Sequence, residues 1–312
     1  MPFNRGAAAM AVALVASSSV WPAAQTPAPQ VFQFVVSVTD AAGTPVTDLR
    51  PDDVVMSEDG VRQQVVKVEP LAVPMKLTIG VDNGLDSADA LPYYQTGLTG
   101  LVEALPPDVE ITLIATAPQP RMIAKPTTDR TQILRGINTV GPERAKPRFS
   151  DTLVEYSERL QREAKDRKAS PYLPVLVMVS TNAADAGSYP PKDIEKAVMF
   201  LATRHAKVNA VVTSTRPGDV KGVAALDASL QAVVARPAAK LTNGRFEALA
   251  LANRLATLLP EWGRDLAALH ARQTTQFRVT VERSRGGNLQ NPRIELARPG
   301  LNGAVTLDGY PP

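Results

Sequence analysis

Two acidic residues follow one apolar run in this 312-residue chain, and both could act as ligands of a cation. The run 75–81 ends directly in Asp82, after which Asn83 and Gly84 form a turn that leads to Asp86. In α/β proteins, ligands bind at the carboxyl ends of the strands of the sheet. Carboxylate oxygens are ligands that Mg²⁺ prefers. This segment therefore predicts a metal site or a polar-ligand site at one edge of a sheet.

The elements that must position this site alternate between strand and helix. Strand patterns occupy residues 76–82, 109–115, 174–180 and 207–213, and helical periods occupy residues 91–105, 129–138, 151–168, 191–205, 221–235 and 247–270. Such alternation predicts a mostly parallel sheet that is covered by helices on both faces. The almost continuously apolar run 173–180 is typical of a central strand buried on both faces. We therefore expect an α/β, Rossmann-like domain.

Short strand patterns flank this α/β segment on both sides. They occupy residues 31–38, 53–58 and 61–68 before it and residues 275–281, 293–297 and 304–307 after it. Neither set of strands is large enough to form a stable domain alone, and chain termini often lie close together. We therefore expect the two sets to pair in one small β unit. The expected division is a β segment 31–72, an inserted α/β domain 73–272 and a β segment 273–312.

Residues 1–24 have the pattern of a secretory signal peptide. Arg5 supplies a positive charge, residues 6–20 form an apolar stretch too short to span a bilayer, and Ala23 and Ala24 are small residues suited to cleavage. A spacer follows at residues 25–30. No later stretch approaches membrane-spanning length. We expect an exported protein, periplasmic or extracellular, whose mature chain has no transmembrane segment.

The composition excludes several functions. There is no cysteine, which removes disulfides, thiolate nucleophiles and thiolate metal sites. The 34 Lys and Arg residues nearly balance the 31 Asp and Glu residues and form no basic block, so nucleic-acid binding is not expected. His205 and His270 are the two histidines, and no Gly-x-Ser-x-Gly motif accompanies them. We expect His205 to serve as a cation at a helix end rather than in catalysis.

Several short motifs, in their order and spacing, resemble a known family. They are residues 38–46 (VTDAAGTPV), 58–60 (EDG), 81–82 (VD), 129–137 (DRTQILRGI), 176–180 (LVMVS), 241–245 (LTNGR) and 298–301 (RPGL). Together they are similar to landmarks of the bacterial secreted "VWFA-related" branch of von Willebrand factor type A proteins, over essentially the whole mature chain. The resemblance implies a protein-binding, adhesion-like A domain. It also implies a metal-ion-dependent adhesion site, where Mg²⁺ is held by three loops and leaves one position for a carboxylate of the partner.

The first of the three loops departs from the family pattern. The family has Asp-x-Ser-x-Ser, and this chain has Asp82, Gly84 and Asp86 at the three ligand positions. Gly84 offers no side-chain oxygen, whereas Asp86 could replace a serine with a carboxylate.

The other two loops also depart from the pattern. The second loop falls at residues 150–152, where Asp151, or Thr152 after a slip of one residue, takes the place of the family's threonine. The same segment is alternatively an ordinary helix N-cap, with Glu155 completing a capping box. The third loop reads Ser180, Thr181 and Asn182 and lacks the family's carboxylate. Asp185 follows as a further candidate ligand or a solvated loop residue.

The resemblance and these departures leave two interpretations of the site. Either Asp82, Asp86 and Asp151 form an altered Mg²⁺ site, or the site is degenerate and holds no metal. In both, we expect a non-enzymatic module that binds a partner protein through the same loops. The partner-binding candidates are Asn83, Gly84, Thr152, Thr181 and Asn182. The alternatives are a hydrolase that uses a divalent metal on the three carboxylates and an inert structural scaffold.

Overall fold

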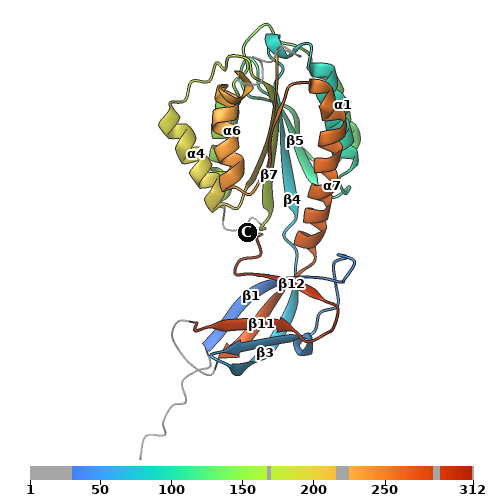
Figure 1. Cartoon of the computed structure of the whole chain (residues 1–312), viewed down its shortest axis with the longest axis vertical. Helices are drawn as coiled ribbons and strands as arrows, with labels where there is room; N and C mark the ends of the chain where they lie inside the picture. The colour runs from blue at the N-terminus through green and yellow to red at the C-terminus, as the bar shows by residue number, and fades with distance from the viewer. Residues whose placement is uncertain (1–29, 167–169, 216–224, 284–288, 311–312) are drawn as a thin grey trace, which may run out of the picture.

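The computed structural model describes residues 30–166, 170–215, 225–283 and 289–310. Two units, an α/β domain and a β unit, follow one another along the long axis of the molecule (Figure 1). The chain enters the β unit with β1 (Gln30–Thr39), passes through the whole α/β domain and returns with β10 (Gln276–Arg283). The expected signal peptide and all of the spacer except Gln30 lie outside the described residues.

The α/β domain is built on a six-stranded sheet. In sheet order the strands are β6 (Arg121–Thr127), β5 (Glu110–Ala115), β4 (Met75–Val81), β7 (Leu173–Thr181), β8 (Lys207–Thr213) and β9 (Phe246–Leu249). Neighbouring strands are parallel except β5 and β6, which are antiparallel. All of β7 is buried, as predicted for a central strand. Because β4 lies beside β7 with Val81 opposite Val179, the ends of these two strands meet at one edge.

Helices cover both faces of this sheet, which confirms the predicted α/β fold class (Figure 1). One face carries α1 (Leu91–Glu103), α2 (Arg130–Thr139) and α7 (Leu255–Thr274), and the other carries α3 (Phe149–Glu163), α4 (Pro191–Thr203) and α6 (Leu230–Leu241). Helices α1 and α7 pack closely because Gly263 has no side chain. A Cβ atom at Gly263 would lie 2.6 Å from the carbonyl oxygen of Leu101.

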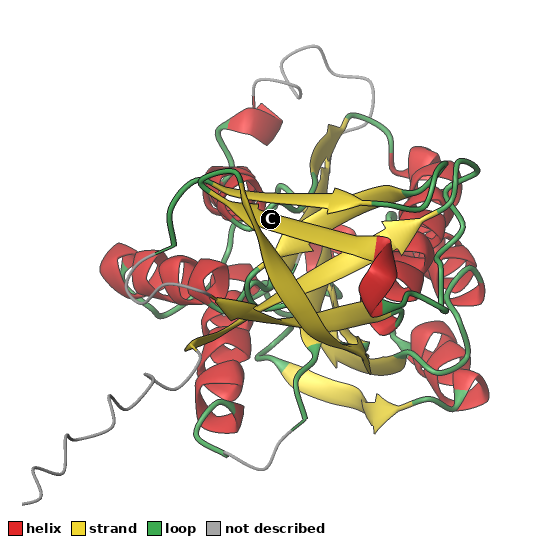
Figure 2. Cartoon of the chain, turned by 90° about the horizontal axis from the view of Figure 1, so that it is seen from below, coloured by secondary structure: helices red, strands yellow, loops and turns green. Residues whose placement is uncertain are grey.

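The β unit is a second six-stranded sheet made from both ends of the chain. Its order is β11 (Pro292–Leu296), β2 (Val54–Glu58), β3 (Val61–Leu71), β10, β1 and β12 (Asn302–Thr306). Strand β1 pairs antiparallel with β10, with Phe34 opposite Val279, and both side chains lie in the core of this unit. The predicted pairing of the N- and C-terminal strands is therefore confirmed. Figure 2, seen from below, shows these strands in front of the helices of the α/β domain.

Both histidines hold chain segments together where the two units meet. His270, near the end of α7, accepts a hydrogen bond at Nδ1 from the amide of Met75 (3.2 Å), and its Nε2 lies 2.9 Å from a carboxylate oxygen of Asp108. His205 follows the end of α4, as predicted, and its Nε2 lies 2.9 Å from Asp308 in the C-terminal segment. The His205 ring also stacks on Tyr310 at 4.8 Å. These contacts place both rings away from the edge that carries Asp82.

The structure differs from the sequence prediction at both edges of the α/β sheet. Strand β6 was not expected because Pro126 argues against a strand. The strand forms because it lies at the edge of the sheet, where a proline costs no ladder hydrogen bond. The helix expected over residues 247–270 is wrong in its first part, which contains the edge strand β9 and the short helix η3 (Ala252–Arg254). Strand β9 has only four residues, which is too short for a recognisable strand pattern, and it is a strand because it pairs with β8.

The helix expected at 221–235 lies partly outside the described residues. Helix α6 begins later, at Leu230, where the Ser229 hydroxyl accepts a hydrogen bond from the amide of Ala232 (3.2 Å). In the described part of the chain, no helix is long and apolar enough to cross a membrane.

Candidate functional site

Asp82 lies at the carboxyl end of β4 and is almost completely buried, with 1% of its surface exposed. Its Oδ1 accepts a hydrogen bond from the amide of Gly84 (2.8 Å). Its Oδ2 accepts three more, each 3.0 Å long, from the Ser180 hydroxyl, the Thr181 hydroxyl and the Thr181 amide. A carboxylate has about four acceptor positions. Donors of the chain itself therefore satisfy this one, and the same bonds tie the ends of β4 and β7 together.

Residues 141–148, which connect α2 to α3 and which we call the covering loop, lie directly on the turn after Asp82. The Asn83 side-chain amide donates to the carbonyl of Gly141 (3.2 Å), and the Asn83 carbonyl accepts from the amide of Glu143 (2.7 Å). The amide of Leu85 donates to the carbonyl of Ala145 (3.0 Å). These three bonds fix the loop over the turn that carries Gly84, the second ligand position of the family's first loop.

Gly84 is the residue that allows the covering loop to approach so closely. A Cβ atom at Gly84 would lie 2.8 Å from Cδ of Pro147 and 3.0 Å from the carbonyl oxygen of Ala145. A serine at this position, as the family pattern has, would require the loop to move. The missing serine is therefore a packing feature of this chain as well as a lost ligand.

Asp86 lies on the short helix η2 (Leu85–Ser87) and is exposed to solvent. The neighbouring Ser87 is fully buried, and its hydroxyl donates to the carbonyl of Gly84 (2.7 Å). Over the described ranges, no three His, Cys, Asp or Glu side chains come together in a group that could hold a metal. Asp82, Asp86 and Asp151 are thus not gathered at one point.

Asp151 lies in the first turn of α3, with its side chain 5% exposed, and has a cation of the chain as its partner. The guanidinium of Arg148 donates to its Oδ2 at 2.9 Å. The Ser188 amide (2.7 Å) and the Tyr189 amide (3.4 Å) donate to Oδ1. Burial works against ionisation, but the hydrogen bonds from Arg148 and from the two amides outweigh it, so the pKa of Asp151 lies below its ordinary value.

The N-terminus of α3 is capped from a distant loop, so the capping box predicted from the local sequence is wrong. The N-cap position is Arg148, whose side chain accepts no capping hydrogen bond, and Ser150 and Asp151 are already inside the helix. Asp185 instead accepts hydrogen bonds from the amides of Phe149 (2.7 Å) and Ser150 (3.3 Å) and from the Ser150 hydroxyl. Asp185 is therefore neither the free loop residue nor the late metal ligand that the sequence suggested.

The candidates for partner binding are mostly internal. Asn83, Thr152 and Thr181 are each no more than 1% exposed, and the backbone of Gly84 is also buried. The Thr152 hydroxyl donates to the carbonyl of Arg148 (2.8 Å). Asn182 is half-buried and accepts hydrogen bonds from the amide (2.9 Å) and the hydroxyl (3.1 Å) of Thr215. These side chains hold the loops in place beneath the surface that a partner would reach.

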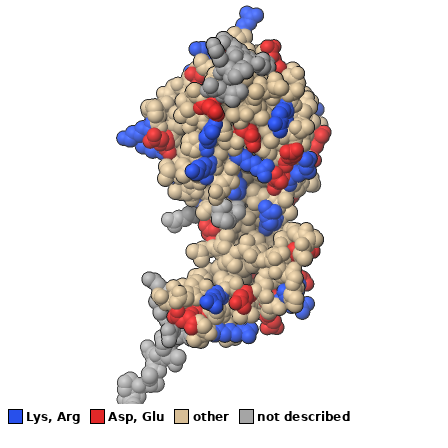
Figure 3. Space-filling model, in the orientation of Figure 1, with Lys and Arg blue, Asp and Glu red and all other residues tan. Residues whose placement is uncertain are grey.

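The accessible surface above them comes from neighbouring residues of the same loops. Leu85 is 58% exposed. Other exposed residues are Asp86, Asp89, Arg144, Lys146 and Ser188. This surface, which we call the loop face, combines one large apolar side chain with charges of both signs. Charges of both signs are also interspersed over the side of the α/β domain seen in Figure 3.

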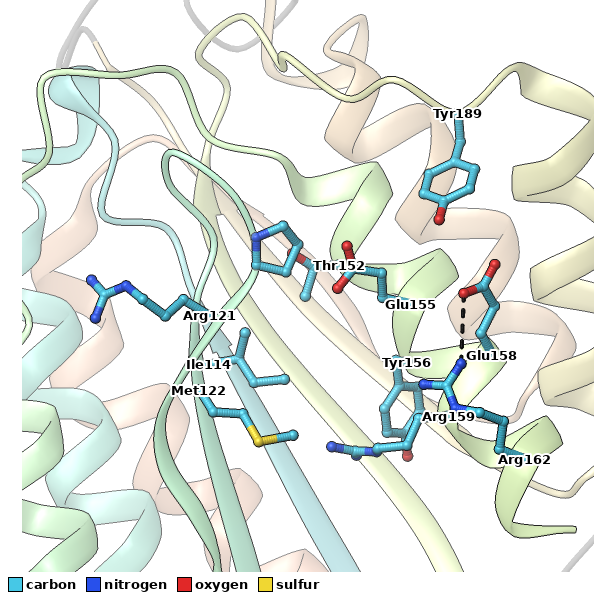
Figure 4. A pocket seen from close by; sticks show the side chains of 11 residues that line it. Ile114, Arg121, Met122, Thr152, Glu155, Tyr156, Glu158, Arg159, Arg162 and Tyr189 are labelled. Atoms are coloured by element: carbon cyan, nitrogen blue, oxygen red, sulfur yellow. Dashed lines mark ion pairs between the residues drawn. The ribbon is translucent and has the colours of Figure 1, made fainter.

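A cavity of about 340 Å³ lies beside the loop face, between the β5–β6 edge and α3 (Figure 4). Ile114, Arg121 and Met122 line one side, and Glu155, Tyr156 and Arg159 line the other. Burial, followed by the charges of Asp151 and Glu158, raises the pKa of Glu155. The Arg159 guanidinium donates to the hydroxyl of Thr78 (2.6 Å). Glu158 and Arg162 form an ion pair of 3.8 Å at the rim.

The residues at this edge do not fit the Mg²⁺ site that the resemblance implies. The Asp82 carboxylate is saturated by the chain, the Gly84 position is closed by the covering loop, Asp86 faces solvent and Asp151 is paired with Arg148. Mg²⁺ needs several oxygen ligands in near-octahedral geometry. The arrangement instead suits a surface that is fixed by hydrogen bonds and one internal ion pair.

The comparisons with solved structures return von Willebrand factor type A proteins. The chain is similar to BatB, a conserved hypothetical protein from Bacteroides thetaiotaomicron, with 12% identity, a TM-score of 0.46, and coverage of 62% of this chain and 99% of that one. It is similar to a von Willebrand factor type A protein from Catenulispora acidiphila, with 10% identity, a TM-score of 0.48, and coverage of 89% and 74%.

A third similar structure is proximal thread matrix protein 1 from the mussel byssus with a zinc-occupied metal-ion-dependent adhesion site, at 13% identity, a TM-score of 0.43, and coverage of 71% and 50%. No protein-family model matches the chain, and no curated protein matches it. The α/β domain has the architecture predicted for a von Willebrand factor A-like protein, a mostly parallel sheet with helices on both faces. At these levels of identity and TM-score, the neighbours assign neither a partner nor a metal to this chain.

Proposed function

We propose that this protein is an exported, metal-independent interaction module that binds a partner protein through the loop face. The proposal rests mainly on one observation: hydrogen bonds within the chain hold the loops of this face in one arrangement. Three backbone-anchored bonds hold the covering loop, and Asp82, Asp151 and Asp185 bind the loops and helix ends beneath it. A surface that is already ordered loses little entropy on binding, which favours its use in recognition.

The composition of the loop face supports a protein as the partner. An exposed leucine surrounded by charged side chains of both signs resembles the apolar centre and polar rim of a protein interface. Metal independence is supported by Arg148, because its positive charge lies beside Asp151 where the family would use a cation. Export is supported by the pattern of residues 1–24.

Photo-crosslinking can test the binding proposal directly. A photoreactive amino acid placed at Leu85, which is 58% exposed, should give a defined adduct in cells that express the full chain. The matched control is the same amino acid at Val61, which is 54% exposed and lies in the β unit. We expect an adduct at Leu85 only, with a yield that EDTA does not change.

Two results would contradict the proposal. Equal labelling from both positions, or none from either, would leave an inert scaffold as the better description. Loss of the adduct in EDTA, with recovery on adding Mg²⁺, would show that the interaction needs a metal. Export is tested separately: we expect the chain in the periplasm or medium with residues 1–24 removed, as read by intact mass, and a full-length cytoplasmic chain would rule it out.

A further inference from the structure

A second cavity, of about 380 Å³, lies at the opposite end of the sheet from Asp82. It is lined by Lys207, the first residue of β8, by Asn243 and Arg245 in the turn before β9, and by one side of α7. These strands are parallel to β4 through β7, so their first residues lie at the amino edge of the sheet. The cavity is therefore separate from the loop face, and its use does not depend on the function proposed above.

Positive charge is in excess around this cavity. Lys207, Arg245 and Arg272 line it together with a single carboxylate, Asp265. Asp265 is paired with Arg245 at 2.6 Å. Lys207 donates to the carbonyl of Asn243 (3.2 Å), which does not neutralise its charge. Arg272 forms no ion pair with any residue that the structure describes. Two cations thus share one cavity without a carboxylate of their own.

The electrostatics of Lys207 agree with this arrangement. Burial, followed by the charge of Arg272, lowers the pKa of Lys207. Like charges that share a cavity repel each other, and an anion placed between them would relieve that repulsion. A charge-assisted hydrogen bond from an ammonium or guanidinium group is also roughly twice as strong as a neutral one.

The remaining wall of the cavity is apolar and rigid. Trp262, Leu266 and Leu269 come from α7 and are each less than 10% exposed. The turn opposite them is fixed, because the Asn209 side chain accepts a hydrogen bond from the amide of Arg245 (3.0 Å) and donates to the carbonyl of Leu176 (3.3 Å). Cavities of roughly 300–1,000 Å³ with apolar walls and a few polar groups are typical of small-molecule sites.

We propose that this cavity binds a small amphiphilic anion, whose carboxylate or phosphate head lies between Lys207 and Arg272 and whose apolar body packs on Trp262, Leu266 and Leu269. The residues at positions 241–245 (LTNGR) would then serve to place Asn243 and Arg245 at the mouth of the site.

Trp262 provides the readout. The chain has two tryptophans, Trp21 and Trp262, so Trp21→Phe in the full chain leaves a single emission signal from the cavity wall. The probes are hexanoate, hexyl phosphate, hexan-1-ol and inorganic phosphate. We expect saturable changes in emission with the first two, and binding at least about tenfold weaker for the alcohol and for inorganic phosphate, which lack the head or the body. The tighter of the first two identifies the head group.

Variants connect the signal to the cavity. In the same background, Lys207→Met and Arg272→Gln should each weaken hexanoate binding by about tenfold. The matched control is Arg264→Gln, on an exposed position of α7 that does not line the cavity, and it should leave binding unchanged. Because Arg272 is exposed, its variant should keep the urea midpoint of the parent even if Lys207→Met does not. Equal affinity for hexanoate and hexan-1-ol, equal affinity for hexanoate and inorganic phosphate, or unchanged binding in Arg272→Gln would overturn the proposal.

Discussion

The guanidinium of Arg148 lies 2.9 Å from the carboxylate of Asp151, which is three positions further along the chain in the first turn of α3. Asp151 is one of the two residues, with Thr152 as the other, that the family resemblance places at the ligand position of the second loop. Its counter-charge therefore comes from the covering loop, through a side chain that also donates to the carbonyl of Pro118 (2.8 Å). One residue thus neutralises Asp151 and joins the loop after β5 to the start of α3.

Removal of this cation should destabilise the protein measurably. Arg148→Gln leaves the buried Asp151 carboxylate with only uncharged donors, which are two amides and the Ser188 hydroxyl. We expect a loss of about 1–3 kcal/mol in the free energy of unfolding, less than for a fully buried pair because Arg148 is 32% exposed. Urea unfolding measures it. Arg144→Gln, at an exposed position in the same loop, should change the value by less than about 0.5 kcal/mol. Equal losses in the two variants would mean that the Arg148–Asp151 ion pair does not contribute to the free energy of unfolding.

Introducing the family's serine at position 84 should destabilise the protein and should not create a metal site. The side chain of Gly84→Ser would begin 2.8 Å from Pro147, so we expect a loss of about 1–3 kcal/mol. Gly141→Ser is a matched control, because a Cβ atom at Gly141 has no atom within 4 Å. We expect calorimetric titration of Mg²⁺ into Gly84→Ser to give no binding heat. Heat in this variant, with unchanged stability, would mean that the covering loop moves aside freely.

The N-cap that Asp185 supplies to α3 should stabilise the protein as much as a cap from a residue next to the helix would. Asp185→Ala removes the acceptor for the amides of Phe149 and Ser150, and loss of an N-cap costs about 0.5–2 kcal/mol. Asp185→Asn keeps one acceptor oxygen and should recover part of that loss. The comparison variant is Asp89→Ala, at an exposed position of the loop after β4. If Asp185→Ala and Asp89→Ala unfold at the same urea concentration, the cap does not contribute.

Stability should fall in acid because of Asp151. Its pKa in the folded protein lies below the ordinary value of about 3.9 that it has in the unfolded chain, so the unfolded chain binds the proton first. The contribution of Asp151 is complete above that unfolded pKa and is lost as the pH falls through the folded one. Urea unfolding between about pH 6 and pH 3 should show a shallower decrease for Asp151→Asn than for the parent. Identical slopes would assign the acid sensitivity to other carboxylates.

The fold was largely predictable because its signals are local. The apolar run that forms β7 and the alternation of strands and helices predict the parallel sheet, and the strand patterns at 53–58 and 61–68 predict β2 and β3. The edge strands β6 and β9 were missed because their partners, and not their own sequences, make them strands.

The position of Asp82 in the fold was predictable, but its contacts were not. Asp82 does lie at the carboxyl end of its strand, where the pattern put it. The roles of Asp185 and Arg148 depend on the packing of three loops that lie far apart in the sequence, and spacing along one loop does not reveal such contacts. The one local sign of this packing in the sequence was Gly84, whose missing side chain allows the covering loop to approach.

The pairing of β1 with β10 sets the order in which this protein can be completed. Gln33 and Thr280, joined by a hydrogen bond of 3.1 Å, are 247 residues apart in the chain. During synthesis, β1 must wait with unpaired edges until almost the entire chain has been made, whereas the α/β domain is complete once α7 appears. Non-local strand pairing is slow, and unpaired strands tend to aggregate. The β unit should therefore be the last part to form and the part most in need of protection before it closes.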